Sequence, residues 1–478
     1  MTKTDYLRQT HHEFLDASEA ALANPNLQRI LGQLGDTLGQ RNREAWEQLP
    51  NSDLIREQAR TIKDQTLAEL DTHLQTLEAS VLARGGRVYW ADDAAAARKH
   101  VLDVIQSRGA TRVVKSKSMT TEEIHLNPAL QAAGIETVET DLGEYIIQLA
   151  GHRPSHIVGP ALHLSAAEVA VILSKPAGEI LPAERVALAG FARKQLRMNF
   201  SLAEVGISGV NFAIAETGSI VLVSNEGNAR LTTALPKVHI AIMGMEKVIP
   251  KLADLPYFLK VLARAATGQK LSVYTSIITG ARREGEIDGA EEFHLIILDN
   301  GRSKILGSPL RESLFCIRCG ACLNACPIYR SVGGHAYGGV YAGPIGAVLT
   351  PLYDGLAANH HLPQASSLCG ACQAACPVKI QIPQMLVQLR EQLHDEPGQQ
   401  SRLESLAYRL WARTLRSPRL YRWGTWSLTR TLGWWKRRSP WLTKLPGKLG
   451  GWTEKRDFPA PAQKRFRDWW QDEGRHEP

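Results

Sequence analysis

Cysteine is missing from most of this chain. All seven cysteines among its 478 residues lie between positions 316 and 376, and a disulfide framework is not expected in a chain of this size without a secretion signal. The polar start from Met1 to Asp5 predicts that no such signal is present, and the lack of any run of eighteen apolar residues excludes a transmembrane helix. Neither a Gly-x-Gly-x-x-Gly after a first strand nor a Walker-type Gly-Lys-Ser/Thr loop occurs, so these nucleotide-binding fingerprints are not supported. With 44% hydrophobic and 22% charged residues, the composition predicts a soluble protein of two or three domains.

A net positive charge is lacking over most of the length and is confined to the C-terminal region. The formal net charge is +8, yet residues 401–478 hold 18 Lys and Arg against 7 Asp and Glu, a net of +11. Residues 1–400 therefore carry a net charge of −3. Nothing in this distribution suggests that the whole protein binds nucleic acid.

The cysteines that are present form two blocks with one repeated pattern. The first block follows C-x2-C-x2-C-x3-C-P, and after forty-two residues the second follows C-x2-C-x3-C-P. An x2 gap places successive sulfurs on one side of a tight loop, within reach of three corners of a cubane. Zinc is the main alternative, because C-x2-C pairs also occur in zinc ribbons, but four cysteines within eleven residues fit tetrahedral zinc poorly. The pattern predicts two [4Fe–4S] clusters.

The second block is one ligand short. By the spacing of the first block, its missing cysteine falls at position 366, which is Ser366. In bacterial-type proteins the fourth cysteine of the run binds the other cluster. This scheme assigns Cys316, Cys319, Cys322 and Cys376 to cluster 1, and Cys326, Cys369 and Cys372 to cluster 2. The fourth iron of cluster 2 is then bound by a hydroxyl such as Ser366 or Ser367, bound by a partner or small molecule, or lost to leave a [3Fe–4S] centre.

Alternating strands and helices are expected between about residue 80 and residue 300. Residues 1–60 precede them as a polar helical arm without visible chemistry. Alternation of this kind indicates a parallel sheet covered by helices. Strands are expected at 87–90, 111–115, 134–138, 155–158, 238–243 and 294–298, a hairpin at 210–223, and helices at 93–107, 121–133, after 164 and at 251–266.

Two groups of polar residues in this α/β region are candidates for chemistry. The first is Lys115-Ser116-Lys117-Ser118-Met119 at the carboxyl end of a strand, where open sheets form ligand crevices and lysines attract anions. The second is Glu216 and Glu226, with Asn225 and Asn228 nearby. The alternatives are a solvated loop for the lysines and ordinary turn residues for the others.

Several segments resemble the lactate utilisation protein B family. They are Lys117-Ser118-Met119-Thr120-Thr121-Glu122-Glu123, the stretch from Asn211 to Gly218, Gly343-Pro344-Ile345-Gly346 and the cysteine blocks, which are the most specific part. The resemblance covers nearly the whole chain. It implies a large domain similar to CoA transferases and ribose-phosphate isomerases, and an iron–sulfur component of a multi-protein system that oxidises L-lactate to pyruvate.

The expected architecture has four parts. They are a helical arm (1–60), an α/β domain (61–300), a helical two-cluster ferredoxin-type domain (301–392) and a helical basic C-terminal region (393–478). The favoured function is electron transfer for a lactate-oxidising oxidoreductase, with a partner handling the substrate. In the alternative, the α/β domain itself binds and converts an anionic acid or thioester near Lys115, Lys117 and Glu216, and the clusters are its redox outlet. Oxygen-sensitive clusters and the lack of an export signal predict a cytoplasmic location.

The C-terminal region combines arginine with tryptophan. Nine of the eleven tryptophans lie there: Trp411, Trp423, Trp426, Trp434, Trp435, Trp441, Trp452, Trp469 and Trp470. Both residue types have an apolar body and a polar end, which favours protein contacts and membrane interfaces. Docking to other subunits of the complex is expected first and a peripheral membrane contact second, while stacking on nucleic acid is the weakest alternative.

Overall fold

The computed structural model describes residues 11–157, 159–395, 402–436, 440–445, 450–454, 456–460 and 464–472, together with residues 447 and 462. The chain divides into two compact units, residues 1–393 and 394–478.

A six-stranded parallel sheet is the centre of the first unit. Its order is β1-β10-β7-β4-β2-β3. The bounds are β1 Arg87–Ala91, β10 Glu292–Leu298, β7 Val238–Gly244, β4 Val205–Gly209, β2 Arg112–Lys115 and β3 Glu136–Glu139. β7 is buried along its whole length, as expected for a parallel strand with both faces covered. The parallel, helix-covered sheet predicted from the alternation is confirmed, and β4 is an additional strand.

A smaller four-stranded sheet has the order β8-β5-β6-β9. It contains β8 (Val248–Ile249), β5 (Phe212–Ile214), β6 (Ser219–Ser224) and β9 (Tyr274–Ile278). β5 and β6 pair antiparallel around the turn at residues 215–218, with Ile214 opposite Ser219. The predicted hairpin is therefore present.

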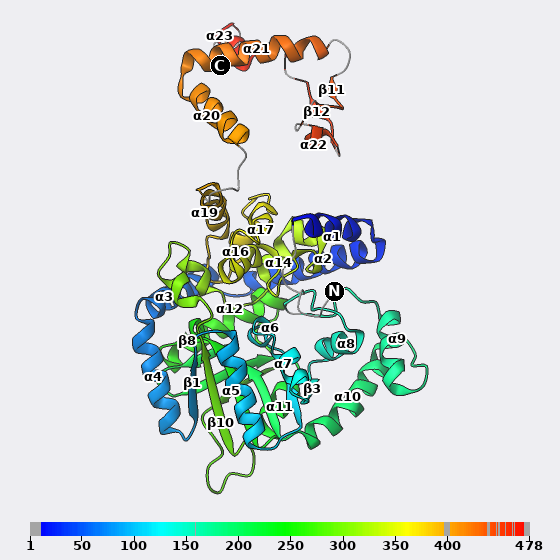
Figure 1. Cartoon of the computed structure of the whole chain (residues 1–478), viewed down its shortest axis with the longest axis vertical. Coiled ribbons are helices and arrows are strands. Elements are labelled where there is room, and N and C mark those ends of the chain that lie inside the picture. Colours follow the sequence, from blue (N-terminus) through cyan, green and yellow to red (C-terminus); the bar gives the residue numbers. More distant parts are fainter. Residues whose placement is uncertain are drawn as a thin grey trace. The chain divides into compact units, whose positions relative to one another are not determined.

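Helices bury both faces of the large sheet (Figure 1). One apolar cluster packs α5 (Ala94–Ser107) and α7 (Leu126–Ala132) onto the strands. A second joins α8 (Leu142–Ala150), α9 (Ala166–Ala177) and α10 (Arg185–Leu202) near β2 and β3. The third and largest contains residues of α3 (Ser52–Ala68), α4 (Leu70–Ala83), α12 (Leu255–Thr267), the small sheet and the cysteine region. The α/β domain and the cysteine region thus share one core.

The cysteine region, residues 311–395, is built from helices and the loops between them. Its elements are η3 (Arg311–Phe315), α14 (Ala321–Ala325), α15 (Pro327–Val332), η4 (His335–Tyr337), α16 (Gly343–Asp354), α17 (His361–Gln364), α18 (Ala371–Ala375) and α19 (Ile382–Asp395). Two N-terminal helices, α1 (His11–Ala23) and α2 (Pro25–Glu47), pack against it. From α2, Gln28 donates a hydrogen bond of 2.7 Å to the Ser331 carbonyl and Asp36 forms an ion pair of 2.5 Å with Arg330. The predicted N-terminal helices are therefore present, and the first two cover the cysteine region.

Two predicted elements differ from the structure. Residues 155–157 form a loop and not a strand, and residue 158 lies outside the described residues. The Ser155 carbonyl accepts a hydrogen bond of 2.7 Å from the Tyr329 hydroxyl, so its backbone bonds to the cysteine region instead of a strand. The predicted helix at 121–133 is split into α6 (Met119–Glu123) and α7 at His125, whose φ is +51°. Pro128 lacks an N–H and would clash with the carbonyl four residues earlier in a continuous helix.

The second unit contains two long helices, α20 (Arg402–Arg416) and α21 (Pro418–Lys436). Shorter elements follow: β11 (Trp441–Leu442), α22 (Gly450–Thr453), β12 (Phe458–Pro459) and α23 (Phe466–Asp472), with β11 and β12 antiparallel. The side chains of Trp434 and Trp435, and residues 437–439, lie outside the described part. No helix within the described ranges is both long and apolar enough to span a bilayer.

Candidate metal centres

The two cysteine blocks adopt the same backbone conformation fifty residues apart. Arg318 and Gly320 have φ values of +59° and +76°, and Leu368 and Gly370 have φ values of +54° and +82°. A short helix then begins in each case, α14 in the first block and α18 in the second. A left-handed non-glycine residue is costly for the backbone, so its recurrence at matching positions indicates a shared structural requirement.

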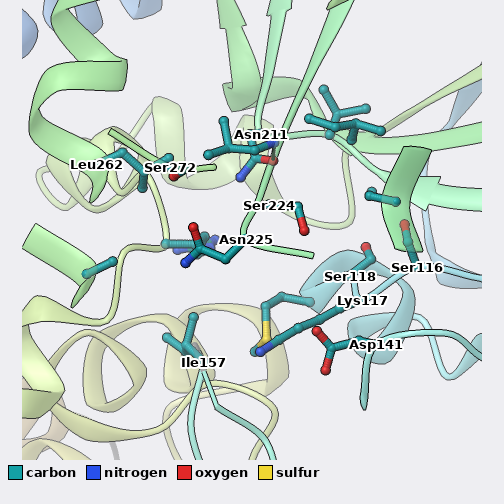
Figure 2. Close-up of a pocket in the computed structure, with 18 of the residues that line it drawn as sticks. Ser116, Lys117, Ser118, Asp141, Ile157, Asn211, Ser224, Asn225, Leu262 and Ser272 are labelled. Atoms are coloured by element: carbon teal, nitrogen blue, oxygen red, sulfur yellow. Dashed lines mark hydrogen bonds between the residues drawn. The ribbon is translucent and has the colours of Figure 1, made fainter. Parts of the chain in front are cut away.

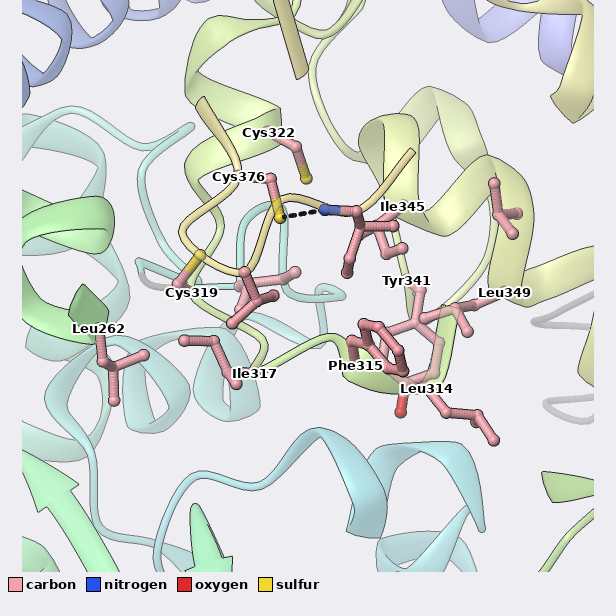
Figure 3. Close-up of a cluster of buried hydrophobic side chains, with 14 of the residues drawn as sticks. Leu262, Leu314, Phe315, Ile317, Cys319, Cys322, Tyr341, Ile345, Leu349 and Cys376 are labelled. Atoms are coloured by element: carbon pink, nitrogen blue, oxygen red, sulfur yellow. Dashed lines mark hydrogen bonds between the residues drawn. The ribbon is translucent and has the colours of Figure 1, made fainter. Parts of the chain in front are cut away.

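Four thiols form the first group. The cysteines are Cys316, Cys319, Cys322 and Cys376. Figure 3 shows the sulfur atoms of Cys319, Cys322 and Cys376 turned toward one another. Burial raises the pKa of Cys322 well above its usual value, and the charges of the other three thiols raise it further. Buried thiols of this kind become thiolates only when a cation replaces their protons, which is what bound iron does.

Backbone amides point at the sulfurs of this first group. The Arg318 N–H donates to Cys316 Sγ and the Ile380 N–H donates to Cys376 Sγ, each at 3.4 Å. An amide of Ile345 acts on Cys322 and lowers its pKa against the larger effect of burial. Such N–H donors stabilise thiolates, and hydrogen bonds to sulfur tune iron–sulfur centres. The donor set therefore fits a cubane.

Three thiols form the second group: Cys326, Cys369 and Cys372. Burial raises the pKa of Cys372 to about 11, and the charges of Cys326 and Cys369 contribute. Cys369 is exposed, and its pKa is lowered mainly by the Ala371 amide and then by the Ser367 hydroxyl. The second group thus lies nearer to solvent than the first.

Ser366 occupies the position of Cys316 in the repeated loop. The Leu368 N–H donates to Ser366 Oγ at 3.2 Å, just as the Arg318 N–H donates to Cys316 Sγ. Across the described residues, no three Cys, His, Asp or Glu side chains converge as they would around one metal ion. Each iron of a cubane takes only one protein thiolate, so its ligands need not converge on a single point.

Buried ion pairs join the first cysteine loop to the α/β domain. Arg302 contacts Glu123 at 2.9 Å and Glu246 at 2.6 Å, and Arg318 lies 3.5 Å from Glu246. Burial would raise the pKa of Glu246, but the two arginines outweigh it and lower the pKa to about 2. The Tyr341 hydroxyl also donates to Glu123 at 2.6 Å. Glu123 lies in a segment that resembles the family, but the sequence pattern did not identify Arg302, Glu246 or Arg318, because single charged residues at distant positions carry no spacing signal.

A pocket of about 360 Å³ adjoins the first cysteine loop. It lies beyond the carboxyl ends of β2 and β4, where Ser116, Lys117 and Asn211 lie (Figure 2). Its lining also includes Arg318 and Cys319. Of the residues that the sequence suggested, those in the lining are Ser116, Lys117, Ser118, Met119, Asn225, Glu226 and Asn228.

Lys115 and Glu216, also suggested by the sequence, have structural partners instead. Lys115 Nζ is buried against Glu139 at 2.8 Å and Glu122 at 3.2 Å. The Glu216 carboxylate accepts a hydrogen bond of 3.0 Å from the Leu252 N–H. The sequence suggested the loop that lines the pocket but could not separate Lys117 from Lys115.

Three family models match the chain. Residues 74–298 match the LUD domain, residues 312–380 match a 4Fe-4S dicluster domain, and residues 387–475 match the C-terminal model of lactate utilisation protein B. The first match covers much of the α/β domain and the second covers both cysteine blocks.

Curated relatives match nearly the whole chain. "Lactate utilization protein B" of Geobacillus kaustophilus is 45% identical over 96% of this chain and 94% of its own length. The protein of the same name from Shouchella clausii is 48% identical over 91% of this chain and 92% of its own. Among solved structures, a DUF162 family protein from Deinococcus radiodurans covers 48% of this chain and 98% of its own, with 14% identity and a TM-score of 0.28. That structural likeness is too weak to support a conclusion.

Proposed function

This chain belongs to the lactate utilisation protein B family, and on that premise we propose that it is the iron–sulfur electron-transfer subunit of a system oxidising L-lactate to pyruvate. The observation that carries the proposal is the division of the seven cysteines into two groups on repeated loops. Two adjacent sets of thiols serve electron transfer better than a single structural site, because electrons then enter at one centre and leave at the other.

The proposed ligands of cluster 1 are the four mutually interacting thiols. When bound, clusters of this type supply one-electron transfer at potentials set by hydrogen bonds and burial. The chain's own contribution is to bury Cys319, Cys322 and Cys376 and to direct the Arg318 and Ile380 amides at the sulfurs of Cys316 and Cys376. Arg318, which lies between Cys316 and Cys319, also places a buried positive charge in the first cysteine loop.

The proposed ligands of cluster 2 are Cys326, Cys369 and Cys372, which leaves one iron without a thiolate. Ser366 Oγ is the protein atom whose position in the repeat matches a ligand. A serine hydroxyl is a harder donor than a thiolate and is protonated at neutral pH, so it binds iron less firmly. We therefore infer a weakly held fourth iron, with a [3Fe–4S] form as the product of its loss.

The proposed setting is a cytoplasmic complex. Iron–sulfur clusters and unoxidised thiols persist in a reducing compartment. None of the seven cysteines, all within the described residues, forms a disulfide. Electron transfer also requires other subunits that deliver and receive electrons. The basic, tryptophan-rich C-terminal region is the proposed docking surface for them, and a peripheral membrane contact is the alternative use of that surface.

Anaerobic reconstitution of the purified chain tests the function. We expect clusters that an artificial donor reduces and an artificial acceptor reoxidises, without lactate-dependent reduction by the chain alone. Adding the other subunits of the native complex should make cluster reduction depend on lactate. Failure to form clusters, or clusters that remain redox-inert, would contradict the electron-transfer role.

A second candidate function is favoured by the pocket beside Cys319. In it, the α/β domain itself binds and converts an anionic acid or thioester, and the clusters accept the electrons. Lactate-dependent reduction by the purified chain without any partner would support this candidate over the first.

A further inference from the structure

The pocket is built jointly by the α/β domain and the first cysteine loop. Ser116, Lys117 and Ser118 follow β2, Val210 and Asn211 follow β4, and Cys319 closes the pocket from the cysteine region. The carboxyl ends of parallel strands are where open α/β sheets bind ligands. A volume of about 360 Å³ lies within the range of small-molecule sites.

Lys117 is the residue of this pocket whose side chain indicates a bound ligand. Its Nζ atom is buried and has no hydrogen-bond partner among the described residues. Figure 2 shows its side chain extending into the pocket, away from Ser116. Burial lowers the pKa of Lys117, while Asp141, Glu144 and Glu226 oppose that effect from a distance. Buried polar groups in native proteins are almost always hydrogen-bonded, and an unsatisfied one is costly, so an absent anion is the natural partner.

The carboxylates that line the pocket are held by backbone groups and do not reach this ammonium. Asp141 caps α8 by accepting from the Glu144 N–H at 3.1 Å, and Glu226 accepts from the Leu142 N–H at 3.4 Å. The lysine two residues earlier, Lys115, shows the contrasting case with two carboxylates within 3.2 Å. Lys117 therefore remains available to a ligand.

The charge of the lining limits what the ligand can be. Arg318 is already paired with Glu246 at 3.5 Å, and Asp141 and Glu226 add negative charge to the lining, whereas Lys117 has no hydrogen-bond partner among the described residues. A single carboxylate can be matched by Lys117, whereas a polyphosphate would add several uncompensated charges to a partly buried site. The rest of the lining mixes apolar side chains with hydroxyl and amide groups, as small polar organic molecules require.

We propose that this pocket binds a small organic monocarboxylate, with its carboxylate on Lys117 Nζ and its body directed toward the loop of Cys319. The inference rests on the proposed function only in treating Cys319 as a cluster ligand, since Lys117 and its cavity exist without iron. Occupancy of the pocket then links the presence of a carboxylic acid to the immediate surroundings of cluster 1.

Calorimetric titration of the full chain tests the proposal, with L-lactate, pyruvate, inorganic phosphate and coenzyme A as probes. We expect L-lactate or pyruvate to bind, and Lys117→Met to weaken that binding at least about tenfold, the cost of losing a charge-assisted hydrogen bond. Lys194→Met is the matched control, because Lys194 is an exposed lysine outside the pocket. The affinity of the Lys194→Met variant for the same acid should equal that of the wild type.

Two further measurements separate the site from a structural role and from the clusters. Lys117→Met should unfold at a temperature no lower than the wild type, because it removes an unpaired buried ammonium. The acid should change the electron paramagnetic resonance spectrum of the reduced wild type but not that of the variant. Equal binding to the variant, equally tight phosphate binding, preference for coenzyme A, or no carboxylate binding would each overturn the proposal. Carboxylate binding by a chain that forms no redox-active cluster would instead contradict the proposed function alone.

Discussion

The repeated cysteine loop differs between its two copies at one ligand atom. Cys316 Sγ and Ser366 Oγ each accept a hydrogen bond from the N–H two residues later, at 3.4 and 3.2 Å. The backbone has therefore kept the geometry of a ligand loop in the second copy, while the side chain has a harder donor. The two loops therefore differ in the side-chain atom at this position rather than in backbone shape.

Ser366→Cys should give cluster 2 a fourth thiolate. Because the introduced thiol would occupy the place that Cys316 has in the first loop, iron content should rise from about seven to about eight atoms per chain if the wild type holds a three-iron centre. Iron and sulfide analysis measures the content, and electron paramagnetic resonance should show the three-iron signal disappear.

The neighbouring serine provides a matched control for this change. Ser367 is exposed and lies one residue out of register with the first loop, so Ser367→Cys should leave the iron content unchanged. A wild type that already holds two stable four-iron clusters would contradict the weak ligation inferred for cluster 2. Equal gains from both substitutions would contradict the special position of Ser366.

At the scale of elements, buried ion pairs fix the first cysteine loop to the α/β domain. Arg302 on α13 (Arg302–Leu306) contacts Glu123 of α6 and Glu246 of η1 (Met245–Lys247). Its guanidinium also lies 4.9 Å from the centre of the Tyr353 ring on α16. One side chain thus connects four elements from both parts of the shared core.

Arg302→Met should destabilise this junction strongly. The substitution leaves Glu123 and Glu246 buried without their main partner, and breaking a buried pair in this way costs about 3–5 kcal/mol. Thermal unfolding of the cluster-loaded protein measures the loss. Lys304→Met, on the exposed side of the same helix, should change stability little. A small effect of Arg302→Met would indicate that Arg318 alone neutralises Glu246.

Sequence patterns predicted elements well where the signal is local. The alternation of apolar runs gave β1, β2, β3, β7 and β10, because buried strands are short apolar segments with polar boundaries. β4 was missed because its sequence, Val-Gly-Ile-Ser-Gly, contains two glycines and a serine among its five residues. In place of the strand expected at 155–158, residues 155–157 form a loop, because the Ser155 carbonyl bonds to Tyr329, far away in the sequence.

In the candidate site too, features set by neighbouring residues were predictable from the sequence, and features set by tertiary contacts were not. Cysteine spacing predicted the loops, since ligand geometry there is set within a few residues. The pocket depends on which side chains from distant segments face one space. Neither the carboxylate partners of Lys115 nor the absence, in the described part of the chain, of a hydrogen-bond partner for Lys117 Nζ can be deduced from their shared loop. Tertiary packing decides which of the two lysines is available to a ligand.

At the scale of the whole molecule, the two compact units divide the chemistry from the proposed docking surface. All seven cysteines and the pocket belong to the unit of residues 1–393. The other unit exposes large apolar side chains on its two long helices, including Trp411 at 61% and Trp423 at 67%. Exposed aromatic residues beside arginines are typical of surfaces that bind another protein.

Removal of residues 401–478 should therefore abolish association with the other subunits while cluster binding persists. The deletion begins between α19 and α20 and leaves every cysteine in place, so the cluster absorbance should persist. Association with the other subunits should be lost, which co-purification of the complex measures. A milder variant, Trp411→Ser with Trp423→Ser, should weaken association in the full chain without affecting its fold, because both side chains are exposed.

Salt and lipid distinguish the nature of the docking partner. The net charge of +11 attracts anionic surfaces over about 8 Å at physiological salt, so added salt should weaken an electrostatic contact while leaving one made by tryptophans largely intact. Binding to vesicles of anionic lipid, lost on deletion of 401–478 and absent with neutral lipid, would assign this region to a membrane surface instead of a protein partner. If the deletion removed the clusters, the C-terminal region would contribute to their packing, and the proposed division between the two units would be wrong.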